Sequence, residues 1–98
     1  MKENLQQDLI KELFDYNPDT GILTWKVARS NVKVGQEAGC LRTDGYRVVG
    51  INGHNYQVSS IIWLFMTGHL PVPSKGEQIF RRGLARDNNR WKNLRLTT

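Results

Sequence analysis

The side chains best suited to bind a charged partner are concentrated in the last quarter of this 98-residue sequence. Positions 75–98 contain seven Lys and Arg residues and two acidic residues, so their net charge is +5. Positions 1–74 contain seven cations and seven anions and contribute no net charge. This asymmetry indicates a polyanionic partner for the C-terminal segment, with nucleic acid as the first candidate.

A solvated basic tail is the alternative interpretation of this charge. Large apolar residues are interleaved with the cations, and a segment containing so many of them is expected to fold. These residues are Ile79, Phe80, Leu84, Trp91, Leu94 and Leu96. We therefore expect a folded, basic C-terminal surface.

The sequence offers little for metal or nucleophilic chemistry. His54 and His69 stand apart from each other and from Cys or acidic residues at metal-ligand spacing, so both are expected at the surface. No Ser-His-Asp or Cys-His arrangement can be argued from them. No metal site and no cofactor are predicted, and the single Cys40 excludes an internal disulfide.

The composition predicts one small globular domain spanning 1–98, with 39% hydrophobic and 23% charged residues. The longest apolar run, 61–66, is far shorter than the roughly 20 residues that span a bilayer. Nothing in the sequence resembles a signal peptide. We expect no membrane partner and a cytoplasmic location.

An α+β fold is expected to position the basic segment, beginning with a helix. Leu5, Leu9 and Leu13 recur at spacing four and predict an amphipathic helix over 2–16. The sequence Asn-Pro-Asp-Thr-Gly at 17–21 ends this helix, because proline cannot continue it and glycine favours a turn. The helix is expected to cover a sheet, with partner binding as the alternative.

A short strand at 22–27 is predicted next, with Trp25 in the core rather than stacked on a base. Residues 28–44 are polar and contain glycine, which predicts a long loop. The cations of this loop are expected in solvent, with phosphate contacts as the alternative: Arg29, Lys33 and Arg42.

A small antiparallel sheet containing a β-hairpin at 46–58 is the clearest local prediction, because Asn-Gly between two strand-like runs favours a type I′ turn. Ser59 and Ser60 are expected to cap a helix at 61–67. This central helix is apolar nearly all round and should be buried, with Gly68 as its C-terminal stop.

Three stretches of the sequence together resemble the small phage-encoded HNH homing endonucleases. The first is Leu-Phe-Asp-Tyr-Asn-Pro-Asp-Thr-Gly-Ile-Leu-Thr-Trp-Lys at 13–26. The second combines Gly45-Tyr46, the hairpin, Ile62-Trp63 and Thr67-Gly68 followed by proline. The third is Asp-Asn-Asn-Arg-Trp-Lys-Asn-Leu-Arg at 87–95. In this order they cover the sequence from about residue 13 to its end.

The resemblance implies a nuclease scaffold whose reactive groups are replaced. In the family an Asp-His pair supplies a metal ligand and the general base, and an Asn twelve residues after the His orients it. Asn93 matches that Asn, and the residue twelve positions before it is Arg81, preceded by Phe80. Phenylalanine cannot ligate a metal, and a guanidinium stays protonated and cannot act as a general base.

Two further departures weaken the nuclease centre. The family's upstream His-Arg pair is Ser59-Ser60 here, and its last metal ligand would lie near position 102, beyond Thr98. We therefore expect a degenerate ββ remnant at 78–98 without the closing helix, and no catalytic residue. A substitute site could be built only by rearrangement of groups whose spacing does not favour it: Glu77, Asp87 and His69.

The sequence thus predicts a catalytically inactive HNH-like protein that binds double-stranded DNA. Phosphate contacts, with Asn88 or Asn89 reaching sugar or base edges, are predicted for the C-terminal segment. The predicted DNA-binding residues are Arg81, Arg82, Arg86, Asn89, Arg90, Lys92 and Arg95. Arg81 would neutralise a phosphate where the family holds its metal, with a merely solvated Arg81 as the alternative. Trp91 is expected to fix the loop of Asn93 rather than to stack on a base.

Two other functions stay open. One is an interaction module that binds, and inhibits or redirects, a host protein acting on nucleic acid. The other is a working nuclease with an unrecognised site. Loss of the closing helix would leave apolar surface uncovered, so a homodimer is also expected. A phage origin would place the protein in the host bacterial cytoplasm.

Overall fold

The computed structural model describes residues 6–28, 32–51, 53–81 and 89–97. The predicted α+β fold class is confirmed, since the described residues form two α-helices and three small antiparallel sheets. The elements in chain order are α1 (Gln7–Leu13), β1 (Phe14–Asn17), β2 (Ile22–Trp25), β3 (Cys40–Leu41), β4 (Arg47–Ile51), β5 (His54–Gln57), α2 (Val58–Thr67), β6 (Gln78–Arg81) and β7 (Leu94–Thr97). Short 3-10 helices lie at Pro73–Lys75 and Trp91–Asn93.

The first helix is shorter than the sequence predicts. It ends at Leu13, and Phe14–Asn17 forms a strand that pairs with β2, so the predicted helical end at residue 16 is wrong. Phe14 continues the apolar stripe of the helix, but as a strand residue it lies opposite Trp25, with ring centroids 4.5 Å apart. Burial of this aromatic pair favours the strand over another helical turn. Positions 2–5 of the predicted helix lie outside the described residues.

The segment predicted as one long loop, 28–44, is partly a strand. Cys40–Leu41 pairs with β4, and an isolated bridge joins Thr24 to Glu37. This correction reflects a pairing too short to leave a pattern in the sequence. Within this segment Lys33 and Arg42 are exposed, as expected, and Arg29 lies outside the described residues.

The predicted hairpin is confirmed: β4 and β5 pair antiparallel, with Ile51 opposite His54. Gly53 in its turn has a φ of +83°, a conformation that glycine adopts without strain. The helix after it begins at Val58, so the predicted cap at Ser59 and Ser60 is wrong. Strand β5 leads directly into the helix, and Gln57 occupies the N-cap position without a side-chain capping bond. The predicted stop is confirmed, since the N–H of Gly68 bonds to the carbonyl of Leu64.

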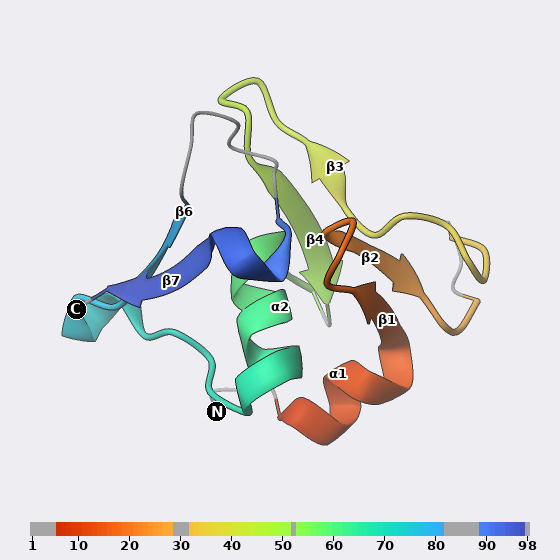
Figure 1. Cartoon of the computed structure of the whole chain (residues 1–98). Coiled ribbons are helices and arrows are strands. Elements are labelled where there is room, and N and C mark those ends of the chain that lie inside the picture. The colour runs from red at the N-terminus through yellow and green to blue at the C-terminus, as the bar shows by residue number, and fades with distance from the viewer. Residues whose placement is uncertain (1–5, 29–31, 52, 82–88, 98) are drawn as a thin grey trace.

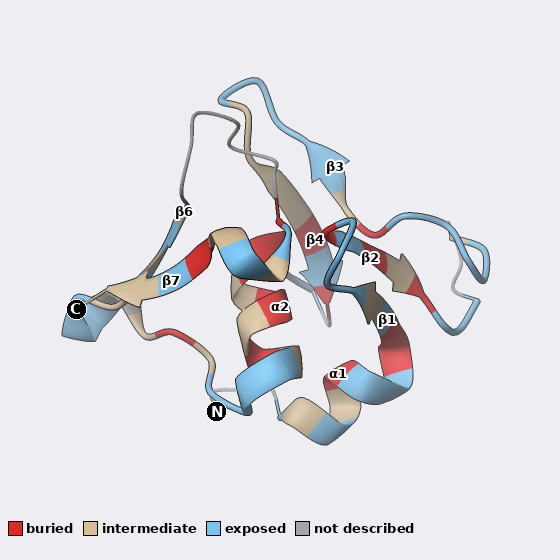
Figure 2. Ribbon diagram, in the orientation of Figure 1, coloured by how far each residue is buried: buried red, intermediate tan, exposed pale blue. Residues whose placement is uncertain are grey.

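Helix α2 lies at the centre of the fold, between α1 and the β6–β7 pair (Figure 1). Its first turns are fully buried at Ile61 and Ile62 against other elements of the core, whereas Met66 near its end is 37% exposed. Leu64 is also buried, at 1% exposed, so the predicted burial holds as far as Leu64 and fails at the end of the helix (Figure 2). Trp25 is 5% exposed, which confirms its predicted place in the core. Among the described residues no helix has the length and apolar character needed to cross a membrane.

Candidate nucleic-acid interface

Strands β6 and β7 form the predicted C-terminal ββ unit. They pair antiparallel, with Gln78 opposite Thr97 and Arg81 opposite Leu94. Asn93 directly precedes Leu94, so the backbone pairing brings positions 81 and 93 to the same end of the hairpin. The two positions that the HNH resemblance relates, twelve residues apart in the sequence, therefore lie near each other in the fold.

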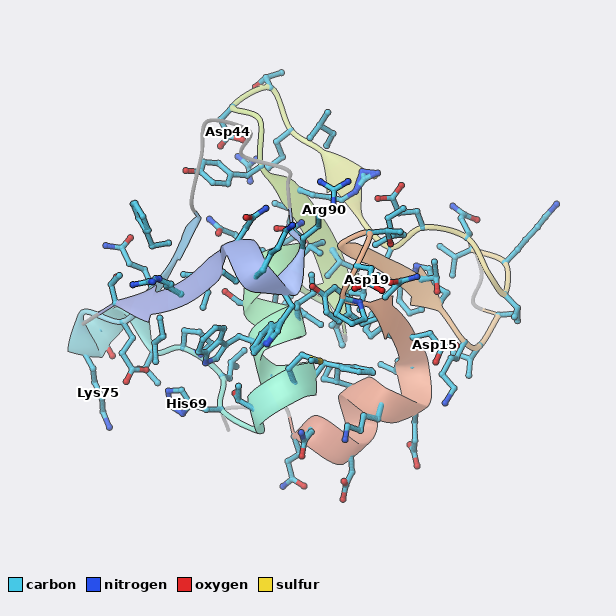
Figure 3. The ribbon with its side chains drawn as sticks, viewed as in Figure 1. Asp15, Asp19, Asp44, His69, Lys75 and Arg90 are labelled. Carbon is cyan, nitrogen blue, oxygen red and sulfur yellow. The ribbon has the colours of Figure 1, made fainter. Side chains whose placement is uncertain are left out.

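The turn at 17–21 holds the chain that leads into β7. The Pro18 carbonyl accepts a 3.1 Å bond from the N–H of Trp91, and the Asp19 carbonyl accepts a 2.9 Å bond from Nε of Arg90. Figure 3 shows Arg90 beside the turn that carries Asp19. The hydroxyl of Tyr16 donates to the carbonyl of Asn89. Two motifs of the resemblance, far apart in sequence, thus contact each other.

Glycine is required in this turn because the turn and the 89–91 segment approach each other closely. Gly21 has a φ of +77°, and a Cβ placed on it would lie 2.4 Å from the backbone N of Arg90. Backbone atoms cannot move aside as a flexible side chain can. Gly21 therefore fixes how near the 89–91 segment lies to the turn between β1 and β2.

Trp91 secures the same segment from the other side. Its ring lies 5.0 Å from that of Trp63 on α2, at an interplanar angle of 35°. The 3-10 turn that begins at Trp91 is closed by the N–H of Asn93, which bonds to the Arg90 carbonyl at 2.9 Å. This contact is the one expected of a residue that orders the loop of Asn93.

The β6–β7 hairpin has two different faces. Ile79 and Leu94 pack toward the core on one face, and Leu94 is 5% exposed. On the other face Phe80 and Arg95 lie opposite each other in the register, and both are exposed. Phe80 leaves 57% of its surface in solvent, which is unusual for an aromatic residue in a strand.

The predicted DNA-binding residues fall into four groups. Arg90, Lys92 and Arg95 are exposed, although Arg90 also supports the turn at 17–21. Asn89 is 3% exposed, so its predicted contact with sugar or base edges is corrected: a side chain buried in the fold cannot reach DNA. The backbone of Arg81 ends β6. The remaining predicted residues lie outside the described ones: Arg82, Arg86 and Asn88.

Of the three groups considered for a substitute catalytic site, the structure brings two together. His69 Nε2 lies 2.8 Å from Oε1 of Glu77, and the same oxygen accepts a 2.9 Å bond from the N–H of Val72. The Val72 bond and the His69 bond lower the pKa of Glu77 below its usual value. This pair closes the connection between α2 and β6, and the sequence named both residues without predicting their contact, because their spacing matches no motif.

A metal site does not follow from this pair. Asp87 lies outside the described residues, and among those described no three His, Cys, Asp or Glu side chains cluster as metal ligands would. His54 and His69 are both exposed, as the sequence predicts. In the described part of the chain, the Glu77 carboxylate contacts the His69 imidazole and also accepts a bond from the backbone N–H of Val72.

A cavity of about 670 Å³ lies between β5 and the first residues of β6. Its wall contains amide side chains, two tyrosines and one carboxylate: Asn55, Gln57, Gln78, Tyr46, Tyr56 and Glu77. None of its described lining residues is a cation. The cavity therefore lacks the charge needed to hold a phosphate, in contrast to the exposed face of β7.

Comparisons of the chain with protein-family models, with curated proteins and with solved structures found no match. The HNH resemblance accordingly depends on the sequence motifs themselves. The contacts between the turn at 17–21 and the 89–91 segment, and the β6–β7 register, are compatible with that resemblance.

Proposed function

We propose that this protein is a catalytically inactive relative of the HNH homing endonucleases that binds double-stranded DNA through residues 75–98. The supporting observation is the exposed surface of the β6–β7 hairpin and the turn before β7. Arg90, Lys92 and Arg95 are exposed there, and the described residues 78–81 and 89–97 contain no acidic side chain. A surface whose own strands and turn carry cations and no carboxylate is suited to a phosphate backbone.

The proposal assigns no cleavage to this site. The chemistry of the family needs a metal ligand and a base at positions 80 and 81, where this chain has phenylalanine and arginine. The ring of Phe80 has no donor atom for a metal, and a guanidinium does not give up its proton at physiological pH. Arg81 is suited to neutralising a phosphate, which favours holding DNA over cutting it.

The test is the salt dependence of duplex binding, measured by fluorescence anisotropy. Each phosphate contact adds about 0.9 to the slope of log affinity against log salt. Arg95→Gln and Lys92→Gln are each expected to lower the slope by about that amount. Lys33→Gln, which removes an exposed cation from the loop between β2 and β3, is the matched control and should leave it unchanged.

A binding curve that is flat between low and physiological salt would overturn the proposal. Incubation of supercoiled plasmid with Mg²⁺ or Mn²⁺ tests the absence of cleavage. Nicking that a chelator abolishes, and that persists after separation from contaminating nucleases, would show a working active site.

A second candidate function is binding to a host protein that acts on nucleic acid. It is favoured by β5, which within the described chain pairs only with β4 and leaves its other edge beside the cavity, whose described lining residues include no cation. Such an edge can accept a strand from a partner. Binding to a defined host enzyme that survives nuclease treatment, and is lost in Gln57→Pro on the β5 edge, would support this function over DNA binding.

A further inference from the structure

The exposed face of β6–β7 carries an aromatic ring as well as a positive charge. Phe80 and Arg95 are directly opposite in the antiparallel register, so their Cβ atoms lie roughly 5 Å apart on one face. The other pair on that face, Gln78 and Thr97, is uncharged, and the Thr97 hydroxyl donates to the Gln78 carbonyl at 3.2 Å. The ring is therefore flanked by a cation and by small polar groups.

Acidic groups near this face are directed elsewhere. Glu77, the residue before β6, bonds through its carboxylate to Val72 and His69 on the connection from α2. Among the described residues no carboxylate forms an ion pair with Arg95. The positive charge beside Phe80 is thus available to an anionic partner.

A second exposed pair in the molecule shows what is special about this one. Leu41 on β3 is also 57% exposed and also lies opposite an arginine, Arg47. Arg47, however, bonds to Glu37 at 3.1 Å, and leucine has no π face. Both pairs therefore have an exposed apolar side chain beside an arginine. Of the two pairs, only Phe80 and Arg95 combine an aromatic ring with an arginine that forms no ion pair among the described residues.

We propose that Phe80 stacks on an unpaired base of a DNA strand whose phosphate is held by Arg95. This inference rests on the proposed DNA binding and narrows its substrate to DNA with unpaired bases. In an intact duplex each base face is covered by the neighbouring bases. An aromatic side chain on a β-strand can therefore contact a base face only where a base is unstacked. A base that is already unpaired avoids the cost of leaving it, and base–aromatic stacking then adds affinity without sequence preference.

The experiment compares two DNA probes with the same number of phosphates. One is a fully paired duplex, and the other is the same duplex with a short central stretch of mismatched bases. The wild-type protein is expected to bind the mismatched probe about five- to 150-fold more tightly for one stacked base. Phe80→Ala should bind both probes equally and should keep a steep salt dependence, because the cations that contact phosphates remain.

Two further variants make the result specific to the ring. Phe80→Trp keeps an aromatic face and should retain the preference, and Leu41→Ala removes an equally exposed apolar side chain and should also retain it. Equal binding of the two probes by the wild-type protein, or a preference that survives Phe80→Ala, would overturn the inference. Sedimentation showing a dimer that Phe80→Ala dissociates would overturn it as well, because the ring would then be covered by a second copy.

The two proposals fail in different ways. If the protein binds neither probe, or binds both without salt dependence, DNA binding itself is wrong. If both probes bind equally and with a steep salt slope, DNA binding stands and only the stacking role of Phe80 is lost.

Discussion

The two β-hairpins that pack on α2 are stabilised in different ways. Strands β4 and β5 are joined by a two-residue turn, so every contact between them is local in the sequence. Strands β6 and β7 are separated by a long connection, and the chain before β7 is held by the turn at 17–21 and by Trp63 on α2. Of these two hairpins, the first (β4–β5) depends on its own turn, whereas the second (β6–β7) depends on distant parts of the fold.

Their exposed faces differ in a corresponding way. The solvent-facing side of β5 and the cavity beside it carry amides and no cation among the described residues. The solvent-facing side of β6–β7 carries Phe80 and Arg95. We infer that the β4–β5 hairpin serves as scaffold and that the β6–β7 hairpin serves as the binding surface. Mutations can test this difference.

The largest effect is expected from Gly21→Ala. The new Cβ would meet backbone atoms of Asn89 and Arg90 at 2.6 and 2.4 Å, in addition to the strain of a positive φ. Strain of about 1–2 kcal/mol and overpacking of about 1–3 kcal/mol should together lower the free energy of unfolding in urea. DNA affinity should fall too, because the chain before β7 is displaced.

Gly53→Ala in the turn of β4–β5 is the matched control. Gly53 has nearly the same φ, +83°, but no heavy atom lies within 4 Å of the added Cβ. Only the strain, about 1–2 kcal/mol, should appear, and DNA affinity should be unchanged. Equal losses of stability in the two variants would show that the turn at 17–21 does not support the second hairpin.

The same contrast explains what the sequence could predict. The β4–β5 hairpin was predictable because Asn-Gly specifies its turn within a few residues. The contact of Tyr16 with the Asn89 carbonyl joins residues 73 positions apart, and no local pattern marks it. Asn89 is 3% exposed beside that contact, and so its predicted place on the DNA surface was wrong.

Errors at the ends of elements have a similar origin. Phe14 fits the helical period of the residues before it, and pairing with Trp25 across β1–β2 decides otherwise. Ser59 is a good capping residue, but the helix already begins at Val58, and Ser59 is fully buried. Charge and residue type, by contrast, located the exposed Lys92 and Arg95 correctly, because long cationic side chains are rarely buried.

A smaller effect is expected from Tyr16→Phe, which removes the hydroxyl that donates to Asn89. Loss of this bond should cost about 0.5–1.5 kcal/mol at neutral pH. Burial raises the pKa of Tyr16 from 10.0 to about 12, so the folded state keeps its proton where the unfolded state loses it. Stability should therefore be complete below pH 10 and decline as pH rises to about 12, by at most about 1.4 kcal/mol per unit.

Denaturation in urea across this alkaline range measures the effect. Tyr16→Phe should flatten the decline, whereas Tyr56→Phe on the first hairpin should preserve it. An unchanged alkaline decline in Tyr16→Phe would mean that the hydroxyl is ionised equally in the folded and unfolded states. The link between the turn at 17–21 and the 89–91 segment would then lie in the bonds from the Trp91 N–H and from Nε of Arg90.

The smallest effect is expected from Glu77→Gln, at the start of the second hairpin. Glutamine can still accept the Val72 bond, so the variant removes the charge that faces His69 while leaving the backbone contact. The pKa of Glu77 is lowered in the folded protein, chiefly by the Val72 bond, so its stabilisation is present above the usual pKa and disappears as pH falls through the lowered value. The wild-type and variant melting temperatures should converge at acidic pH.

Glu37→Gln is the counterpart beside the first hairpin, since Glu37 pairs with Arg47 on β4 and is 45% exposed. An exposed pair of this kind contributes about 0.2–1 kcal/mol and is screened by salt. The Glu77 side chain is 17% exposed and is fixed by a backbone donor, so the effect of Glu77→Gln should persist at a salt concentration that removes that of Glu37→Gln. If salt removes both effects alike, the His69–Glu77 contact is an ordinary surface pair, and the support of β6 lies in its packing on α2.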